Sequence, residues 1–191
     1  MRRLAFWFER LLLLTGVLLL AWYGSLLGES WLFQKMAGRQ LDARMADLRR
    51  SGSAVPTSPP PAPGLIGRLE VSRLGVSVVV MEGVGDRTLQ HAIGHIPGTA
   101  LPGQPGNVGI AGHRDTFFRP LQGIRDEDIV SISTPNGEFR YRVISTRIVS
   151  PNEVSVLESG TKEVLTLVTC YPFYFVGAAP DRFIVRAQRI I

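Results

Sequence analysis

The fold is decided by residues 129–143, which read IVSISTPNGEFRYRV. The segment Thr-Pro-Asn-Gly at 134–137 is a turn signal, because Asn-Gly between alternating runs is typical of a tight hairpin. After the turn, apolar side chains alternate strictly with arginines. The apolar positions are Phe139, Tyr141 and Val143, and the arginines are Arg140 and Arg142. A period of two is typical of a strand with one buried face, so the stretch predicts a β-hairpin.

Further short β-like runs lie on both sides of this hairpin, separated by Gly and Pro. They are residues 68–74, 76–80, 108–111, 129–133, 164–169 and 183–187. One short helix is indicated, at residues 88–93. Seven or eight short strands with little helix predict an all-β domain, either a closed barrel or a sandwich. From residue 64 onward the chain has about 128 residues, which is enough to bury an adequate core.

Composition and charge restrict the partners of the chain. Of its 191 residues, 45% are hydrophobic and 19% charged, which excludes a disordered chain. Residues 1–63 hold 8 Lys and Arg against 4 Asp and Glu, whereas residues 64–191 hold 13 against 12. The positive excess lies beside an apolar segment, so membrane lipid is the expected partner and nucleic acid is not. The single cysteine, Cys170, excludes an internal disulfide and a cysteine-based zinc site.

The apolar segment is residues 11–27, a 17-residue run without a charge. At about 1.5 Å per residue it spans ~25 Å, within the usual range for a membrane-crossing helix. Trp7, Trp22, Tyr23 and Trp31 bracket it as interfacial anchors do. A cleaved signal peptide is the alternative, but the apolar run is long for one and no clear cleavage site follows. We therefore predict a transmembrane signal anchor.

The rest of the N-terminal part divides into three segments. Residues 1–10 form a cytoplasmic N-terminus, although basic residues are almost equal on the two sides of the span and orient it weakly. Residues 28–50 read as a juxtamembrane helical stalk, with Leu41, Met45 and Leu48 at helical spacing. Residues 51–64 hold five prolines and predict an extended linker, with a proline-rich peptide ligand as the alternative. The globular domain is residues 65–191.

Two strand ends carry residues that suit thiol chemistry. Cys170 ends the run 164–169, and Pro172 should turn the chain out of the sheet. His113 follows the run 108–111 and Gly112, which allows other atoms to approach closely. A Cys/His pair is the minimum for nucleophilic thiol catalysis, because an imidazolium favours the thiolate. A buried core cysteine is the alternative interpretation.

The other two histidines and the arginines near residues 183–187 are further candidates for a structural or catalytic role. His91 and His95 lie near the short helix and a Pro-Gly turn, where packing or hydrogen bonding is expected. Arg182 opens the run that ends the chain. Alternation points Phe183, Val185 and Ala187 to the core and Arg182, Ile184 and Arg186 to the opposite side. A structural salt bridge is the alternative role for either arginine, and it is the expected one for Arg186.

Three motifs together resemble those of the sortases, which are membrane-anchored cysteine transpeptidases. TLVTC at 166–170 resembles the cysteine signature, GIAGHR at 109–114 the histidine motif and DRFIV at 181–185 the arginine strand. They occur in the family's order and with its usual separations. CYPFY at 170–174 is most similar to class D sortases. One departure is Asp-Glu-Asp at 126–128, where many relatives have Gly-Asp.

The resemblance implies a closed eight-stranded sortase-type β-barrel with one or two short helices, preceded by the transmembrane helix. It implies a single-pass protein of the cytoplasmic membrane whose catalytic domain is extracytoplasmic. Cys170 is then the nucleophile, His113 the general acid/base and Arg182 the stabiliser of substrate and oxyanion. Thr169 and Ala111, within the cysteine and histidine motifs, are the candidate substrate-binding residues. Neither a metal nor a cofactor is expected, and the scattered carboxylates at 153–163 give calcium little support.

The implied reaction is cleavage of a Leu-Pro-x-Thr-Gly-like signal, or one ending in Ala, after its Thr. A thioester at Cys170 would hold the acyl group until an amine on a cell-wall precursor or a pilin attacks. Substrate proteins would carry the signal at the C-terminus. Two alternatives stay open: a cysteine peptidase that uses water as the acceptor, and a membrane-tethered binding module whose cysteine is structural.

Overall fold

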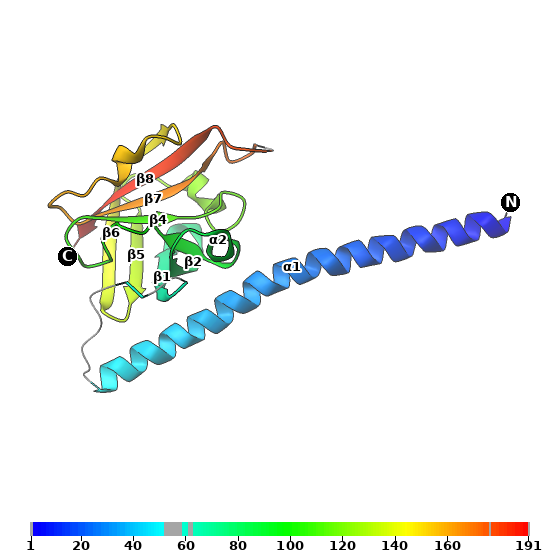
Figure 1. The fold of residues 1–191 in the computed structure, drawn as a ribbon, viewed down its shortest axis with the longest axis horizontal. Helices are drawn as coiled ribbons and strands as arrows, with labels where there is room; N and C mark the ends of the chain where they lie inside the picture. The colour runs from blue at the N-terminus through cyan, green and yellow to red at the C-terminus, as the bar shows by residue number, and fades with distance from the viewer. Residues whose placement is uncertain (1, 52–58, 61–62, 176, 191) are drawn as a thin grey trace.

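The computed structural model describes residues 2–51, 59–60, 63–175 and 177–190, so most of the predicted linker lies outside the described residues. In this part of the chain, a long helix precedes eight strands that close into a barrel (Figure 1). The helices are α1 (Arg2–Ser51) and α2 (Asp86–His91), with short 3-10 turns η1 (Ser72–Leu74), η2 (Arg119–Gly123) and η3 (Val154–Leu157). The strands are β1 (Leu65–Val71), β2 (Val76–Glu82), β3 (Ile93–His95), β4 (Asn107–Ala111), β5 (Ile129–Thr134), β6 (Gly137–Val149), β7 (Val164–Tyr171) and β8 (Asp181–Ile190).

The order of strands around the barrel is β1-β2-β3-β4-β7-β8-β6-β5, and β5 returns to β1. The predicted hairpin is β5–β6, in which Thr134 pairs with Gly137. Two neighbouring pairs are parallel, β2 with β3 and β4 with β7. Parallel strands end at the same edge of a sheet, so β4 and β7 present their carboxyl ends side by side.

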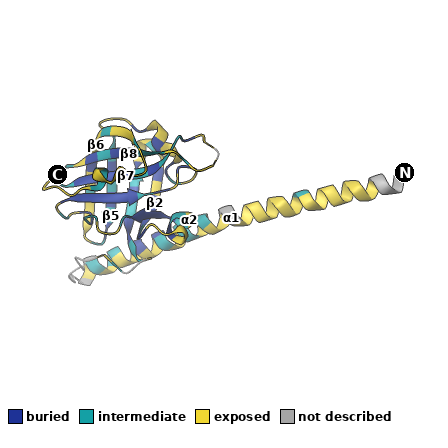
Figure 2. Cartoon of the chain, turned by 45° about the horizontal axis from the view of Figure 1, so that its top comes forward, coloured by how far each residue is buried: buried dark blue, intermediate teal, exposed yellow. Residues whose placement is uncertain are grey.

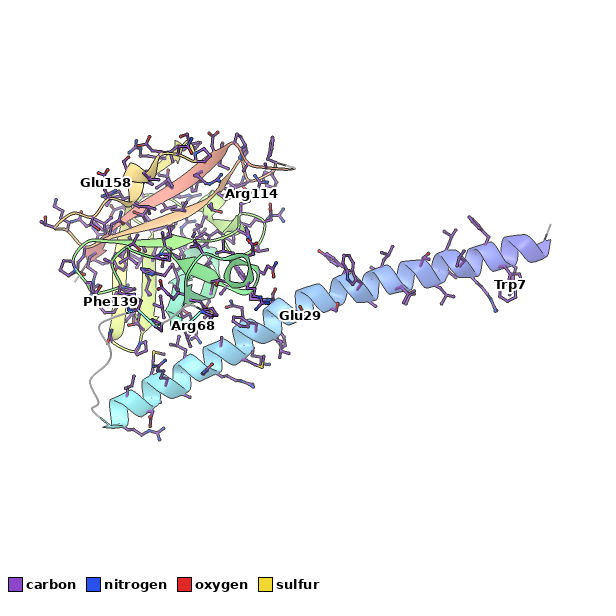
Figure 3. The ribbon with its side chains drawn as sticks, viewed as in Figure 1. Trp7, Glu29, Arg68, Arg114, Phe139 and Glu158 are labelled. Carbon is purple, nitrogen blue, oxygen red and sulfur yellow. The ribbon has the colours of Figure 1, made fainter. Side chains whose placement is uncertain are left out.

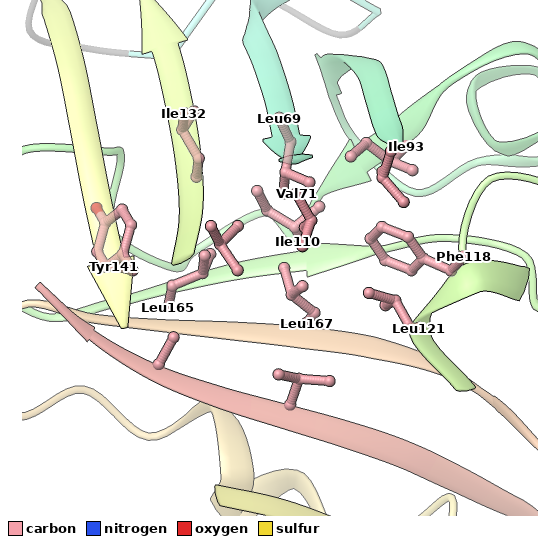
Figure 4. Close-up of a cluster of buried hydrophobic side chains, with 14 of the residues drawn as sticks. Leu69, Val71, Ile93, Ile110, Phe118, Leu121, Ile132, Tyr141, Leu165 and Leu167 are labelled. Carbon is pink, nitrogen blue, oxygen red and sulfur yellow. The ribbon is translucent and has the colours of Figure 1, made fainter. Parts of the chain in front are cut away.

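The inward faces of the strands form one core (Figure 4). Tyr141 and Val143 are fully buried in it, whereas Arg140 and Arg142 are exposed, as the alternation predicts. Val185 and Ala187 of β8 belong to the same core. Ile184 points to the other side of β8 and is nevertheless only 3% exposed.

Two local predictions differ from the structure. The helix predicted at 88–93 is α2, which ends at His91, and Ile93 instead begins strand β3. β3 exists because it pairs with both β2 and β4, a tertiary contact that local pattern does not report. The strand predicted at 68–74 ends at Val71, and the chain then turns through η1 into Gly75, whose φ is 64°.

α1 has two halves with different surroundings (Figure 2). The N-terminal half exposes its apolar side chains and includes a stretch long and apolar enough to cross a membrane, with a mean hydropathy of 2.0. The C-terminal half packs against α2, β1 and β2. Leu41 of this half is fully buried.

Candidate active site

The parallel pair β4–β7 brings His113 and Cys170 to one edge of the barrel. Ala111 pairs with Val168, and each of the two candidate residues lies two positions beyond this pair. The backbone N–H of Gly112 donates to the Val168 carbonyl at 3.1 Å. A Cβ at Gly112 would lie 2.7 Å from the Phe118 ring, which confirms that a close approach requires glycine here. The histidine segment is therefore held directly against the strand that carries the thiol.

Thr169 strengthens this attachment. Its hydroxyl donates to the Gly112 carbonyl at 2.8 Å, and the residue is only 2% exposed. Thr169 thus fixes the backbone next to His113. Neither Thr169 nor Ala111, the predicted substrate-binding residues, is among the residues that line the cavity described next.

Cys170 and Arg182 are direct partners across the antiparallel pair β7–β8. Directly opposed residues project to the same face of a sheet, so the thiol and the guanidinium share one face. Both side chains are partly exposed, and His113 is exposed. These three residues line a cavity of about 350 Å³. The other lining residues are Arg114, Asp115, Gly177, Ala178 and Ala179. The structure therefore brings together the three residues that the motifs single out.

Arg182 is held by its own loop. Its Nη1 donates to the carbonyls of Ala179, at 3.3 Å, and Asp181, at 3.0 Å. Within the described residues, no ion pair joins it to a carboxylate, in contrast to the structural salt bridge that was its alternative role. The remaining N–H groups of a guanidinium are donors that a substrate oxygen can accept from.

Arg114, the last residue of the histidine motif, was given no role from the sequence, and its side chain is buried, with 6% exposure. Its Nη1 donates to the Pro172 carbonyl at 2.9 Å, and its Nη2 to those of Phe175 at 2.6 Å and Gly177 at 3.1 Å. Its Nε lies 3.4 Å from Asp115 Oδ1. Figure 3 labels the residue at the end of the barrel where β7 and β8 connect. Arg114 thus joins the histidine segment to the β7–β8 connection, and its position beside His113 was the only available signal.

The other two histidines have structural surroundings outside the cavity. His95 is 1% exposed, with Nδ1 2.8 Å from Glu82 Oε2 and Nε2 3.0 Å from the Ala100 carbonyl. This confirms the hydrogen-bonding role expected for it. The ring of His91 lies 5.4 Å from that of Phe33 in α1.

Comparisons with known proteins agree with this geometry. The profile of the sortase domain matches residues 69–190, well over half of the chain. The chain belongs to the sortase family. Members of this family are cysteine transpeptidases, and the closed eight-stranded barrel is the sortase fold.

Individual sortases resemble the chain to different extents. Sortase D of Bacillus subtilis (strain 168) is 34% identical over 125 residues, which are 65% of this chain and 63% of that protein. Sortase SrtE1 of Streptomyces coelicolor (strain ATCC BAA-471 / A3(2) / M145) is 29% identical over 177 residues, 83% of this chain and 50% of that protein. The chain therefore spans between half and two thirds of these curated sortases.

Solved sortase structures also superimpose on most of the chain. The Clostridium perfringens Sortase D5 transpeptidase superimposes with a TM-score of 0.69 at 26% identity, covering 83% of this chain and 99% of that one. Sortase C1 from Streptococcus agalactiae superimposes with a TM-score of 0.62 at 27% identity, over 67% of this chain and 68% of that one. Sortase D and Sortase D5 both support the class D likeness of the cysteine motif.

Proposed function

We propose that this chain is a membrane-anchored transpeptidase that cleaves a Leu-Pro-x-Thr-Gly-like or Leu-Pro-x-Thr-Ala-like signal after Thr and transfers the acyl group to an amine. The observation that carries the proposal is the shared cavity of Cys170, His113 and Arg182, at the joined ends of β4, β7 and β8. The proposed substrates are proteins with a C-terminal sorting signal. The proposed acceptor is an amine of a cell-wall precursor or a pilin.

In the first half of the reaction, the Cys170 thiolate attacks the Thr carbonyl carbon. A C–S bond forms, and the carbonyl oxygen becomes an oxyanion that faces the guanidinium of Arg182. The peptide C–N bond then breaks, and protonated His113 gives its proton to the leaving amine. Donors aimed at such an oxyanion typically lower the barrier by ~3–4 kcal/mol. The product of this half is the thioester.

In the second half, an amine attacks the thioester carbonyl while neutral His113 accepts the amine proton. The new C–N bond replaces the C–S bond, and the thiolate and protonated histidine are restored. His113 is exposed and Cys170 partly exposed, so both an amine and a peptide can reach the cavity. Water as the acceptor would give the peptidase instead.

We also propose that the apolar half of α1 anchors the chain in the cytoplasmic membrane as a single span, with the barrel outside the cytoplasm. The apolar stretch of α1 and its exposed large side chains support a membrane location. The orientation follows from the proposed reaction, because sorting substrates and their acceptors are extracytoplasmic.

The test is a library of Leu-Pro-x-Thr peptides, offered with and without an amine. Mass spectrometry should find a thioester at Cys170, and amide product should replace acid product when the amine is present. Cys170→Ala should abolish the thioester. His113→Ala should lower the rate by about 10²–10⁴-fold, with His91→Ala as the matched control near wild type. Acid product alone would indicate a peptidase, and slow alkylation of Cys170 without turnover would indicate a binding module.

The role of Arg182 has its own matched pair. Arg182→Lys keeps the charge and removes the planar fork of donors, so we expect a large loss of kcat with the fold preserved. Arg186→Lys, four residues along the same strand, should be mild. Wild-type kcat in Arg182→Lys would mean that charge alone suffices, and an unfolded Arg182→Lys would return the residue to a structural role.

A further inference from the structure

The C-terminal half of α1 is docked on the barrel through one face. Its covered positions include Ser30, Phe33, Gln34, Gly38 and Leu41, spaced by three or four residues as one helical face requires. The intervening Lys35, Met36, Arg39 and Gln40 are exposed. This segment is therefore more than a spacer between membrane and barrel.

Specific polar contacts fix the docked face. The side chain of Gln34 accepts from the Val79 backbone N–H at 2.9 Å and donates to the His91 carbonyl at 2.6 Å. Arg68 of β1 and Asp42 form an ion pair at 3.2 Å. Val79 lies between the core residues Val78 and Val80 on β2, so it points outward, and yet it is only 1% exposed. The helix covers it, and the barrel is held in one orientation on α1.

This docking begins close to the proposed span. The Ser30 hydroxyl donates to the Gln90 carbonyl of α2, and Ser30 lies three residues beyond the predicted membrane segment 11–27. Three residues of helix rise about 5 Å. If residues 11–27 cross the bilayer, the α2 side of the barrel lies at the level of the lipid headgroups.

The cavity end of the barrel faces the same way. Figure 1 shows the β7–β8 connection extending past α2 toward the N-terminal half of α1, and Figure 2 agrees. Arg114, which lines the cavity, is labelled on this side in Figure 3. The connection exposes two aromatic side chains, Tyr174 at 73% and Phe175 at 44%. The guanidinium of exposed Arg119 lies 5.7 Å from the Tyr174 ring.

We propose that the β7–β8 connection contacts the headgroup region of the bilayer that α1 crosses, so that the cavity opens at the membrane surface onto substrates held there. Amphipathic tyrosine and arginine favour the headgroup region, and arginine is attracted to anionic lipids. The occupant is thus a lipid surface and not a second protein, since the docked helix itself brings the connection to the bilayer. The inference rests on the proposed anchoring by α1.

The test uses the full chain in vesicles of phosphatidylglycerol and phosphatidylcholine. In a Cys170→Ala background, Tyr174→Cys or Asn136→Cys supplies one thiol for a fluorescent label. Asn136 is the matched control, because it is exposed in the β5–β6 turn away from the span. We expect the label at 174 to be shielded from a water-soluble quencher in vesicles but not in detergent, and the label at 136 to be accessible in both. Equal quenching of the labels at 174 and 136 in vesicles would overturn the proposal. If the label at 174 were shielded as strongly in detergent as in vesicles, a protein segment and not the lipid would cover it, which would also overturn the proposal.

Two further measurements separate this inference from the anchoring on which it rests. Flotation of the chain with vesicles tests anchoring alone. A chain that fails to float would show that α1 does not anchor it in the bilayer. The double variant Gln34→Ala, Leu41→Ser undocks the helix, whereas Gln40→Ala, on its exposed face, is the control. We expect undocking to expose the label at 174. In chains that retain Cys170, it should also lower turnover of a vesicle-tethered signal peptide about tenfold or more, and leave that of the soluble peptide unchanged. Shielding of 174 that survives undocking would contradict the proposed orientation.

Discussion

Replacement of Arg114 by lysine tests whether the β7–β8 connection must be fastened for the cavity to work. The arginine donates to the carbonyls of Pro172, Phe175 and Gly177 from a buried position. Lysine has one ammonium on a flexible stem and cannot reproduce the planar, forked set of N–H donors of a guanidinium. We therefore expect Arg114→Lys to keep one of these hydrogen bonds and to lose the other two.

The size of the effect follows from the hydrogen bonds. A hydrogen bond to a charged group contributes about 1.5–3 kcal/mol, so losing two of them costs about 3 kcal/mol at the lower bound. Since about 1.4 kcal/mol is tenfold, opening of the connection becomes about 10²-fold more frequent. The connection also contributes Phe173 to the core, and Arg114→Lys leaves that side chain in place, so the fold itself should be retained.

Chymotrypsin provides the assay, because exposed Tyr174 and Phe175 lie in the connection and cleavage requires it to open. We expect Arg114→Lys to be nicked after these residues about 10²-fold faster than the parent chain, and kcat/KM for a signal peptide to fall with it. Arg142→Lys is the control, since that arginine forms an exposed pair with Glu127 at 3.3 Å. Unchanged nicking and unchanged kcat/KM in Arg114→Lys would refute the fastening role.

Three other predictions concern stability. Burial raises the pKa of the Tyr141 hydroxyl to about 12, so the folded chain keeps a proton that the unfolded chain releases near pH 10. The contribution of this proton to the free energy of unfolding is complete below pH 10 and is lost as the pH rises toward 12. Denaturant unfolding should therefore give a free energy of unfolding about 2 kcal/mol lower at pH 12 than at pH 9, a loss that Tyr141→Phe lacks. Glu127 has a φ of 70°, so Glu127→Gly should be more stable than Glu127→Ala by up to about 1 kcal/mol, the reverse of the usual order, and equal urea midpoints would contradict this. A fragment that begins at Gly64 should fold and cleave soluble peptide. Calorimetry should find this fragment about 2 kcal/mol less stable than a fragment that begins at Glu29, because the shorter fragment leaves Val79 uncovered. Equal stability of the two fragments would show that the helix is not docked.

Strand ends were the most predictable part of the site. Pro172 after Cys170 marks where β7 leaves the sheet, and Gly112 before His113 marks a close approach, so local chemistry already placed both residues at an edge. The hairpin β5–β6 was equally clear, because its turn and its alternation agree. These features depend on residues that are neighbours in the chain.

Strand β3 was not predictable for the opposite reason. It has three residues, Ile93, Gly94 and His95, and glycine is rare in strand interiors. Gly94 is required because a Cβ there would lie 2.2 Å from the Gly83 carbonyl oxygen. The strand exists because β2 and β4 approach from both sides, and one β-branched residue, Ile93, is too short a pattern to indicate a strand.

Arg114 and Gln34 could not be assigned roles from the sequence because their partners are remote. Arg114 contacts carbonyls about sixty residues away, and Gln34 a backbone N–H 45 residues away. Backbone partners of this kind leave no residue pattern, since any side chain can occupy the position. Such contacts become visible only when the barrel is closed.

The parallel pairing of β4 with β7 has a consequence for biogenesis. β5 and β6 lie between these strands in the chain but not in the barrel, where β4 and β7 are direct neighbours, so the pair forms only after a long stretch of chain has been synthesised. Contacts between strands so distant in sequence form slowly, because the intervening chain must first be ordered. A newly made chain therefore holds Cys170 apart from His113, its proposed acid/base partner, until β7 has paired with β4. Thiol reactivity would then be acquired through folding, once the barrel has closed.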